Sequence, residues 1–570
     1  MTPPSAGPAA LSPAADGVRT RQDTGSGGRS RGLARAALLT AALSVAASLL
    51  GLVRDQALAR LFGAGSGTDA FLVAWTVPEF AATLLIEDGL AFALVPMFSL
   101  ALARRARGAP GDPVRALVAA TLPRLAPAFA AVAALTALTA PYLVRVLAPG
   151  LPDRALAVDC TRLTATCVLS FGLAGYASAA LRAHRRFLAP AAIYVAYNTG
   201  IITTMFLCGG AWGVRAAALG VAVGGCLMVA VQLPALLGQV RRGPARRAGP
   251  AADGTRPLAL ALLGTVLLFA LGRQSQVLIE RFLASGLPAG AISHLNYAQK
   301  VAQIPMTLSL MLCTVTFPVV ARALADGDTE RARRRVERDV ALAAHLVLLG
   351  AATVVACAPQ LVGLLFQRGA FTPADTAATA GVMRVYALGL LAQTVVGALA
   401  RTYFSAGRAS WYPAAAMAAG LAATAVLGAG AVTAWGVRGL AAANAAGITV
   451  TAALLLAGTG RRAVPVRTGR VLAGLGRALA VAAVAAAAGA GVAARCAAPA
   501  AGLAAGAATV AAVFALTGAV LGVPGVATAR DLLRPLRSTR STRSAPPLSR
   551  RLPHGRFRRY HRFPWLRRPR

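Results

Sequence analysis

The sequence predicts an all-α membrane protein with about 14 transmembrane helices, and three observations support that prediction. Its 570 residues are 57% hydrophobic and only 14% charged, whereas a soluble protein of this size has about 25% charged residues. Mean hydropathy is +0.63, and the apolar residues come in blocks of about 20, the length of a helix that spans the hydrocarbon core. Arginine-rich and arginine-poor connections also alternate along the chain, which is typical where basic loops stay on one side of a membrane.

The apolar blocks follow an N-terminal tail over residues 1–32 that is rich in Gly, Ser, Pro and Arg and is predicted to be disordered. Basic connections follow every second block, so both termini are predicted to lie in the cytoplasm. The predicted membrane segments are residues 36–62, 69–103, 115–147, 157–182, 188–209, 213–239, 258–284, 289–321, 340–365, 376–406, 411–433, 437–459, 471–494 and 498–522.

The second half of the chain repeats short pieces of the first half. Ala59–Gly65 resembles Glu280–Gly286, and Pro190 corresponds to Pro413, with an offset of about 220 residues or about six segments. An even number of spans gives both copies the same orientation, and parallel repeats commonly enclose a transport site. We therefore expect a six-helix lobe over residues 33–240, a cytoplasmic linker over 241–256, a second six-helix lobe over 257–460 and two extra helices over 461–522.

The stretch Leu50–Pro96 carries more charge than a membrane segment usually tolerates. An ionisable group near the bilayer centre costs about 3 kcal/mol, so several in succession indicate a water-filled cavity or a polar ligand. The alternative is that these groups lie at helix ends and extend to the interface. The charged residues of the stretch are Arg54, Asp55, Arg60, Asp69, Glu79, Glu87 and Asp88.

Lys300 is the only lysine among 58 lysines and arginines, and it lies near the start of the second half. Because that region repeats the opening segments, we expect Arg54 and Lys300 to face one cavity from the two halves. Convergent cations of this kind suit a phosphate-bearing headgroup. The alternative is a chance placement, or a lysine that extends to the membrane interface.

The sequence has no pattern typical of an enzyme or of a metal site. Glu87 and Asp88 are adjacent, so on a helix their side chains point about 100° apart. A nucleophile elbow, a phosphate loop and a His-Glu metal motif are all missing from the sequence. The seven cysteines are scattered without metal-site spacing. We therefore expect no enzymatic activity, no cofactor and no bound metal.

The net charge of +39 does not by itself indicate nucleic-acid binding, because the arginines cluster in the tails and between apolar blocks. The tail over residues 523–570 is rich in arginine, with a few aromatic residues. It is predicted to be a cytoplasmic topology anchor. The alternative is attachment to anionic lipids, which contributes about 1 kcal/mol per basic residue near the surface.

These features resemble the MurJ/MviN lipid II flippases of the MOP exporter superfamily. The matching pieces are Gly51–Asp55, Ala59–Gly65, Thr68–Phe71, Val95–Pro96 and Leu365–Thr372, and the likeness covers residues 36–522. The resemblance implies two six-helix lobes that form a V, with a terminal helix pair that helps to form a lipid-facing groove. It also implies a monomer in the bacterial inner membrane that carries an undecaprenyl-diphosphate-linked peptidoglycan precursor to the outer leaflet by alternating access.

The chain departs from the family pattern at several cavity positions. Ser48 stands where members usually have an arginine. Ala82 and Thr83 replace paired arginines that follow the family's Leu-Pro-Asn motif, which here is Val77–Glu79. Lys300 corresponds to the family's central-cavity arginine of the second lobe and keeps the charge without the bidentate fork. The cavity is therefore expected to be less cationic than in most members.

Some relatives bind sodium through acidic and asparagine side chains of the second lobe. The corresponding segments here, 411–433 and 437–459, contain Asn444 and no carboxylate, so we do not expect that ion. The substrate-binding residues that the resemblance implies are Arg54, Asp55, Asp69, Glu87 and Lys300.

Three hypotheses for function follow. The leading one is a flippase for lipid II or a related polyprenyl-diphosphate sugar. The second is a MOP-type exporter of another lipid-linked oligosaccharide or amphiphile, which the missing arginines would favour. The third is a membrane scaffold without transport activity that recruits cell-wall partners through its tails.

Overall fold

The computed structural model describes residues 26–87, 89–107, 112–240, 257–314, 328–405, 410–462 and 464–521, and within these ranges the regular structure is entirely helical. The predicted linker over 241–256 and basic tail over 523–570 lie outside the described residues. Most of the predicted N-terminal tail does so too, although the first helix already begins at Ser26.

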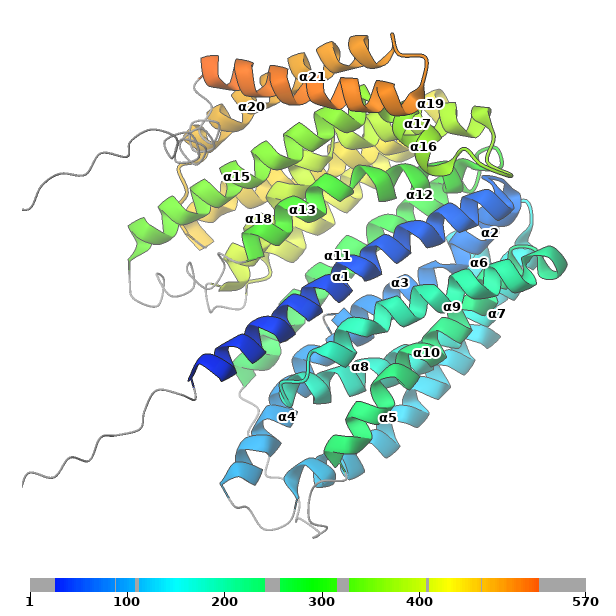
Figure 1. Cartoon of the computed structure of the whole chain (residues 1–570), viewed down its shortest axis with the longest axis vertical. Helices are drawn as coiled ribbons and strands as arrows, with labels where there is room; N and C mark the ends of the chain where they lie inside the picture. The colour runs from blue at the N-terminus through cyan, green and yellow to red at the C-terminus, as the bar shows by residue number, and fades with distance from the viewer. Residues whose placement is uncertain are drawn as a thin grey trace, which may run out of the picture.

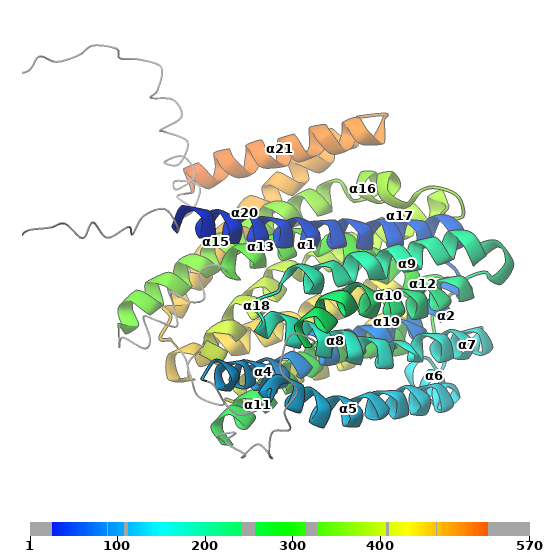
Figure 2. The same ribbon diagram turned by 60° about the horizontal axis from the view of Figure 1, so that its bottom comes forward.

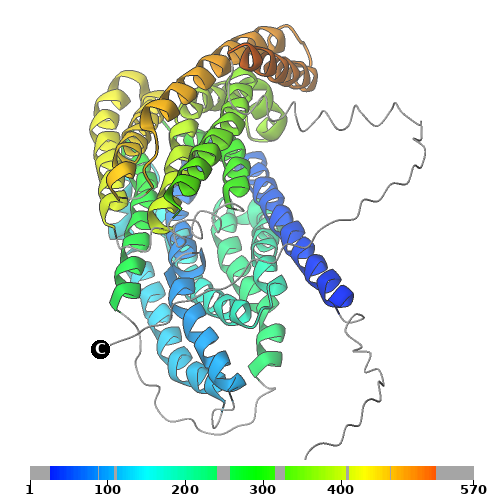
Figure 3. The ribbon, with the colours of Figure 1, turned by 90° about the vertical axis from the view of Figure 1, so that its left-hand side faces the viewer.

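The helices form two bundles that lie side by side (Figures 1 and 3). The first bundle holds α1 (Ser26–Phe62), α2 (Ser66–Ala74), α3 (Thr76–Ala81), a π-helical turn (Ala82–Glu87), α4 (Gly89–Ala106), α5 (Pro113–Leu138), α6 (Ala140–Leu147), α7 (Arg154–Ala165), α8 (Cys167–Ala183), α9 (Leu188–Trp212) and α10 (Arg215–Val240). The second holds α11 (Pro257–Ala284), α12 (Ala291–Ala302), α13 (Ile304–Thr314), α15 (Thr329–Ala356), α16 (Ala358–Phe366), α17 (Pro373–Ala387), α18 (Leu390–Ser405) and α19 (Tyr412–Arg462).

Two further helices, α20 (Thr468–Ala493) and α21 (Pro499–Val520), lie along the outer edge of the second bundle, against α15 (Figure 2). Their outward faces expose large apolar side chains such as Leu472, Leu479 and Leu516. Exposed apolar faces of this kind suit contact with lipid tails.

Ten helices in the described part of the chain are long and apolar enough to cross a membrane, or eleven with the bent pair formed by Pro373–Ala387 and Leu390–Phe404. Helix α19 contains two of the segments predicted from sequence, 411–433 and 437–459. Its backbone breaks between them at Gly436, which has a φ of +55°. The all-helical membrane fold is therefore confirmed, whereas the number of fourteen spans stays a prediction.

Several helices begin where the sequence supplies a capping side chain. The carboxylates of Asp112, Asp153 and Asp328 accept hydrogen bonds from the first backbone amides of α5, α7 and α15. Thr372 and Asp375 form a reciprocal capping box at the start of α17. Such caps satisfy amides that have no partner within the helix, and each stabilises its helix by about 1 kcal/mol.

Small residues allow the helices to pack closely. A Cβ atom on Gly224 of α10 would lie 2.6 Å from the Tyr197 carbonyl oxygen of α9, so these two helices touch backbone to backbone. Close packing of this kind is how helices associate in lipid, where no hydrophobic force drives them together. The N-terminal part of α1 is the exception, since it leans away from the neighbouring helices (Figure 3) and exposes Leu38, Val45 and Leu49.

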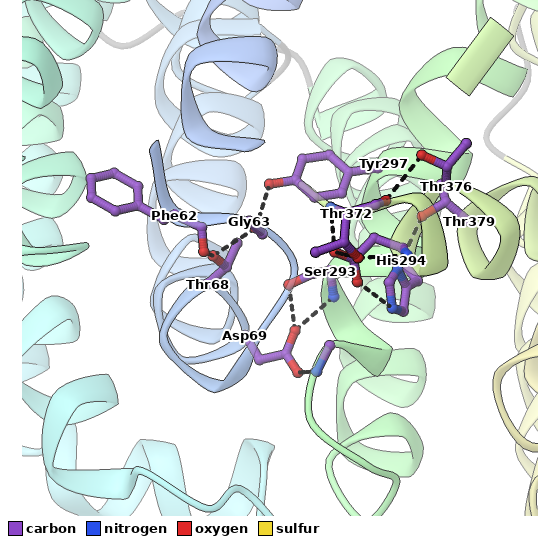
Figure 4. A network of polar contacts seen from close by, with 12 residues as sticks. Phe62, Gly63, Thr68, Asp69, Ser293, His294, Tyr297, Thr372, Thr376 and Thr379 are labelled. Carbon is purple, nitrogen blue, oxygen red and sulfur yellow. Dashed lines mark hydrogen bonds and ion pairs between the residues drawn. The ribbon is translucent and has the colours of Figure 1, made fainter. Parts of the chain in front are cut away.

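The two bundles meet mainly at one end, which we call the closed end. It contains the turn between α1 and α2, the start of α12 and the connection between α16 and α17. At the opposite end, α4 and α15 lie far apart (Figure 1). In Figure 4, Asp69 of α2 accepts hydrogen bonds from the amides of Gly290 and Ser293, both at 2.7 Å, and from the Ser293 hydroxyl. The hydroxyl of Tyr297 donates to the Gly63 carbonyl at 3.4 Å.

The segment Leu365–Thr372 packs on the last turn of α1. The amide of Ala370 donates to the Arg60 carbonyl at 2.9 Å. The adjacent Gly369 has a φ of +62°, and a Cβ atom there would lie 2.3 Å from the same carbonyl oxygen. A residue with a side chain would be strained at this position and would also collide with α1.

We therefore expect Gly369→Ala to lower the free energy of unfolding by about 2 kcal/mol, measured by denaturant unfolding in detergent micelles. Gly286→Ala is the matched control, because Gly286 lies in another closed-end turn, lacks a positive φ and has no atom within 4 Å of a Cβ. Equal stability of the two variants would show that this contact does not constrain Gly369.

Candidate functional site

A cavity of about 310 Å³ lies in the second bundle, on the side that faces the first. Helices α11, α12, α13, α17, α18 and α19 supply most of its wall, and Glu79 reaches it from α3 of the first bundle. Polar side chains occupy much of this wall, which is unusual for a membrane interior. They include Arg273, Glu280, Arg281, Gln299, Lys300 and Gln303.

Glu79 joins the two bundles at this cavity. One oxygen of its carboxylate lies 2.9 Å from Nη2 of Arg281, and the other lies 3.7 Å from Nζ of Lys300. Nη1 of Arg281 also donates to the hydroxyl of Thr76. The Arg281 side chain is 5% exposed and that of Glu79 17%, so the pair is shielded from solvent, whereas Lys300 is 37% exposed. Lys300 is therefore the more accessible of the two cations.

Arg54 is an ion-paired residue of α1. Its Nη2 and Nε atoms donate to the Asp55 carboxylate at 2.7 and 3.0 Å, and its Nη1 donates to the Asn198 amide oxygen at 3.2 Å. Its guanidinium carbon lies 4.5 Å from the ring centre of Trp75. This arrangement neutralises Arg54 locally and adds a cation–π contact. Arg54 can thus remain inside the bundle at low cost.

A second, smaller pocket contains both cations that the sequence singled out. Arg54 and Asp55 line it from α1, and Asn296 and Lys300 line it from α12. Because Lys300 also lines the larger cavity, the two spaces are neighbours. The structure therefore brings Arg54, Asp55 and Lys300 together from the two bundles. Their role in holding a headgroup stays a prediction.

Glu280 lies beside this cluster and is 2% exposed. One of its oxygens accepts from the Gln299 amide and the other from the Asn444 amide. The two segments from which a sodium site was judged contain Asn444 and no carboxylate, whereas in the structure α11 brings the Glu280 carboxylate to this asparagine. Three or more His, Cys, Asp or Glu residues do not gather into a possible metal site anywhere in the described ranges.

The rest of the cavity wall is rich in side-chain amides. Gln303 and Gln393 both donate to the hydroxyl of Tyr386, at 2.8 and 2.9 Å. The Nε2 atom of Gln276 is buried and has no hydrogen-bond partner within the described structure. Amides carry both donors and acceptors, which makes them suited to hydroxyl and amide groups of a ligand. The cavity thus combines a cationic corner with an uncharged polar wall.

The other two predicted site residues lie elsewhere. Asp69 is 3% exposed and belongs to the closed end, where it accepts from the first amides of α12 (Figure 4). Glu87 ends the π-helical turn and accepts a hydrogen bond from Tyr194 of α9 at 3.0 Å. The structure does not place either of them on the 310 Å³ cavity.

The site residues predicted from sequence do not include Arg281, Glu79, Glu280 or Arg273. Glu280 and Arg281 are consecutive charges inside an apolar helix, and that is the signal which could have revealed them. Glu79 was noted as a membrane charge, but its partners come from helices more than 200 positions away in the chain.

A family model and individual relatives both match this chain to one family of proteins. The family model described as "Lipid II flippase MurJ" matches residues 58–501. A lipid II flippase MurJ of Burkholderia cenocepacia is 28% identical over 383 residues, which cover 65% of this chain and 73% of that protein. A probable lipid II flippase MurJ of Vibrio cholerae is 25% identical over 400 residues, 66% of this chain and 73% of the relative.

Solved structures show the same fold. A lipid II flippase MurJ in an inward closed conformation superposes with a TM-score of 0.70 at 17% identity, covering 87% of this chain and all (100%) of that chain. An inward-facing multidrug resistance MATE family transporter of the MOP superfamily gives a TM-score of 0.57 at 14% identity, covering 77% and 99%.

Proposed function

Because the chain belongs to the MurJ family of lipid II flippases, we propose that it moves lipid II across the membrane for cell-wall biosynthesis. It is a multi-pass bacterial membrane protein. In our proposal it works as a monomer in the inner membrane, with both termini in the cytoplasm and without a catalytic step. It carries the headgroup from the cytoplasmic to the outer leaflet.

The observation that carries this proposal is the set of cations where the two bundles face each other, because Lys300 lines both neighbouring pockets, with Arg281 in the larger one and Arg54 in the smaller one. Guanidinium and ammonium groups that converge on one space are suited to a diphosphate. The amide wall formed by Gln303, Gln393 and their neighbours suits the sugar hydroxyls and peptide amides of the same headgroup. The polyprenyl tail stays in the lipid phase.

The arrangement of the contacts supports a proposal of alternating access. The closed end is held by hydrogen bonds between bundles, above all those of Asp69, while the opposite ends lie apart (Figure 1). We infer that this is the state open to the cytoplasm. Rocking of the two bundles would break the closed-end contacts and expose the cavity to the other side.

Cells provide a direct test. Bacteria depleted of their own lipid II flippase should regain outer-leaflet lipid II, detected by an externally added lipid II-binding probe, when they express this chain. A chain that folds in the membrane but leaves lipid II on the inner leaflet would contradict the proposal. Restored export of a different lipid-linked glycan in the same cells would identify the chain as an exporter of that glycan instead.

A further inference from the structure

Glu79 is an acidic side chain of the first bundle that forms ion pairs with the second bundle. It places a negative charge among the cations of the cavity. Its carboxylate contacts Arg281 at 2.9 Å and Lys300 at 3.7 Å. Both partners belong to the second bundle, whereas Glu79 belongs to α3 of the first. The contacts therefore connect the bundles through charge.

The carboxylate of Glu79 uses the same kind of interaction that a phosphate would use. A guanidinium fork and an ammonium group bind carboxylate and phosphate oxygens through similar charge-assisted hydrogen bonds. Arg281 directs one branch of its fork to Glu79 and the other to Thr76, so both branches are engaged by α3. A diphosphate can reach this arginine fully only by replacing contacts made by α3.

We propose that Glu79 is a displaceable counter-ion that couples headgroup binding to movement of the bundles. The diphosphate takes Arg281 and Lys300 from Glu79, and this exchange releases α3 from α11 and α12. The closed end then depends on the remaining contacts between the bundles, above all those of Asp69, and the bundles separate there more readily. This inference rests on the proposed function, since it takes the headgroup to be a lipid-linked diphosphate.

The exchange has a thermodynamic consequence. If the ligand weakens the contact between the bundles, then loss of that contact must strengthen ligand binding by the same factor. Removing the internal competitor also raises the population of the binding-competent state, and the apparent affinity rises in proportion. We expect Glu79→Gln to bind inorganic pyrophosphate about tenfold more tightly than the native protein.

Spin-label distances can follow the bundles while pyrophosphate is added. Trp212 ends α9 and Trp435 precedes the break of α19 at Gly436, and they are 52% and 69% exposed. Both lie near the closed end, since Gly209 of α9 packs against Phe62 at the end of α1 and Gly428 of α19 packs against Leu283 at the end of α11. Replacing both with a ketone amino acid that takes a spin label leaves the native cysteines in place. The full-length protein in lipid nanodiscs should then show a shift toward longer distances when pyrophosphate is added.

Glu79→Gln should show the longer distances without pyrophosphate and respond little to its addition. Asp159→Asn is the matched control, because Asp159 pairs with Arg215 at 2.8 Å within the first bundle. This control should behave as the native protein does. Glu79→Gln that binds pyrophosphate more tightly while keeping the native distances would overturn the inference, since Glu79 would then only lower the charge of the cavity.

Native protein that binds pyrophosphate without any change in distance, or that does not bind it, would also overturn the inference. Failure of the proposed function would look different. The distances would still respond to pyrophosphate as described, but reconstituted protein would leave lipid II in its original leaflet.

Discussion

Arg281→Gln is expected to reduce lipid II transport about 100-fold and to lower the free energy of unfolding by about 3 kcal/mol. The variant loses the fork that is proposed to hold the diphosphate. It also leaves the Glu79 carboxylate, which is 17% exposed, with the longer contact to Lys300. Removing one member of a shielded ion pair is costly because the charge that stays behind loses its nearest partner.

A second variant separates folding from transport. In Arg281→Gln/Glu79→Gln no uncompensated carboxylate remains, so stability should return close to the native value while transport stays low. Arg215→Gln is the control, because Arg215 forms an ion pair of similar length that is 45% exposed, and such pairs contribute little. Transport at the native rate by the stable double variant would show that Arg281 is not part of the transport site.

Asp69→Asn is expected to shift the protein about 100-fold toward the state in which the closed end is open. The carboxylate accepts three hydrogen bonds across the bundles, from Gly290 and Ser293. Hydrogen bonds to a charged group contribute about 1.5–3 kcal/mol each, and the N-terminus of α12 adds favourable electrostatics. An asparagine side chain has the same size as an aspartate side chain. Its NH2 group cannot accept a hydrogen bond, so it cannot replace the second carboxylate oxygen as a partner of the Gly290 and Ser293 donors.

The spin labels at positions 212 and 435 measure this shift, and lipid II transport should fall because the cycle stalls in one state. Asp153→Asn is the control, since Asp153 caps α7 within the first bundle by accepting from Leu156 at 2.9 Å. Unchanged distances in Asp69→Asn would mean that other contacts keep the bundles closed.

Much of the fold could be predicted from sequence because the membrane imposes simple rules. The length of each apolar block predicts a membrane-spanning helix, and the constant offset between the repeated pieces predicts two similar bundles. The sequence also predicts separate segments over 411–433 and 437–459, and Gly436, with a positive φ, divides α19 between them. The sequence could not show the π-helical turn Ala82–Glu87, which interrupts the predicted segment 69–103.

The candidate site was harder to predict, for a physical reason. A charge inside the membrane signals that a partner exists, but the partner is chosen by the packing of distant helices. Arg54 was selected from sequence, yet its nearest partners, Asp55 and Asn198, leave it neutralised. Glu79 and Arg281 are 202 positions apart, and only the crossing of α3 with α11 brings them together.

The most direct measurement of the central claim is translocation of a fluorescent lipid II in liposomes that contain the purified protein. The native protein should make inner-leaflet lipid II accessible to an external quencher much faster than protein-free liposomes do. The stable double variant Arg281→Gln/Glu79→Gln should match the protein-free rate. Equal rates for native protein, double variant and protein-free liposomes would contradict the account, and so would a double variant as fast as the native protein.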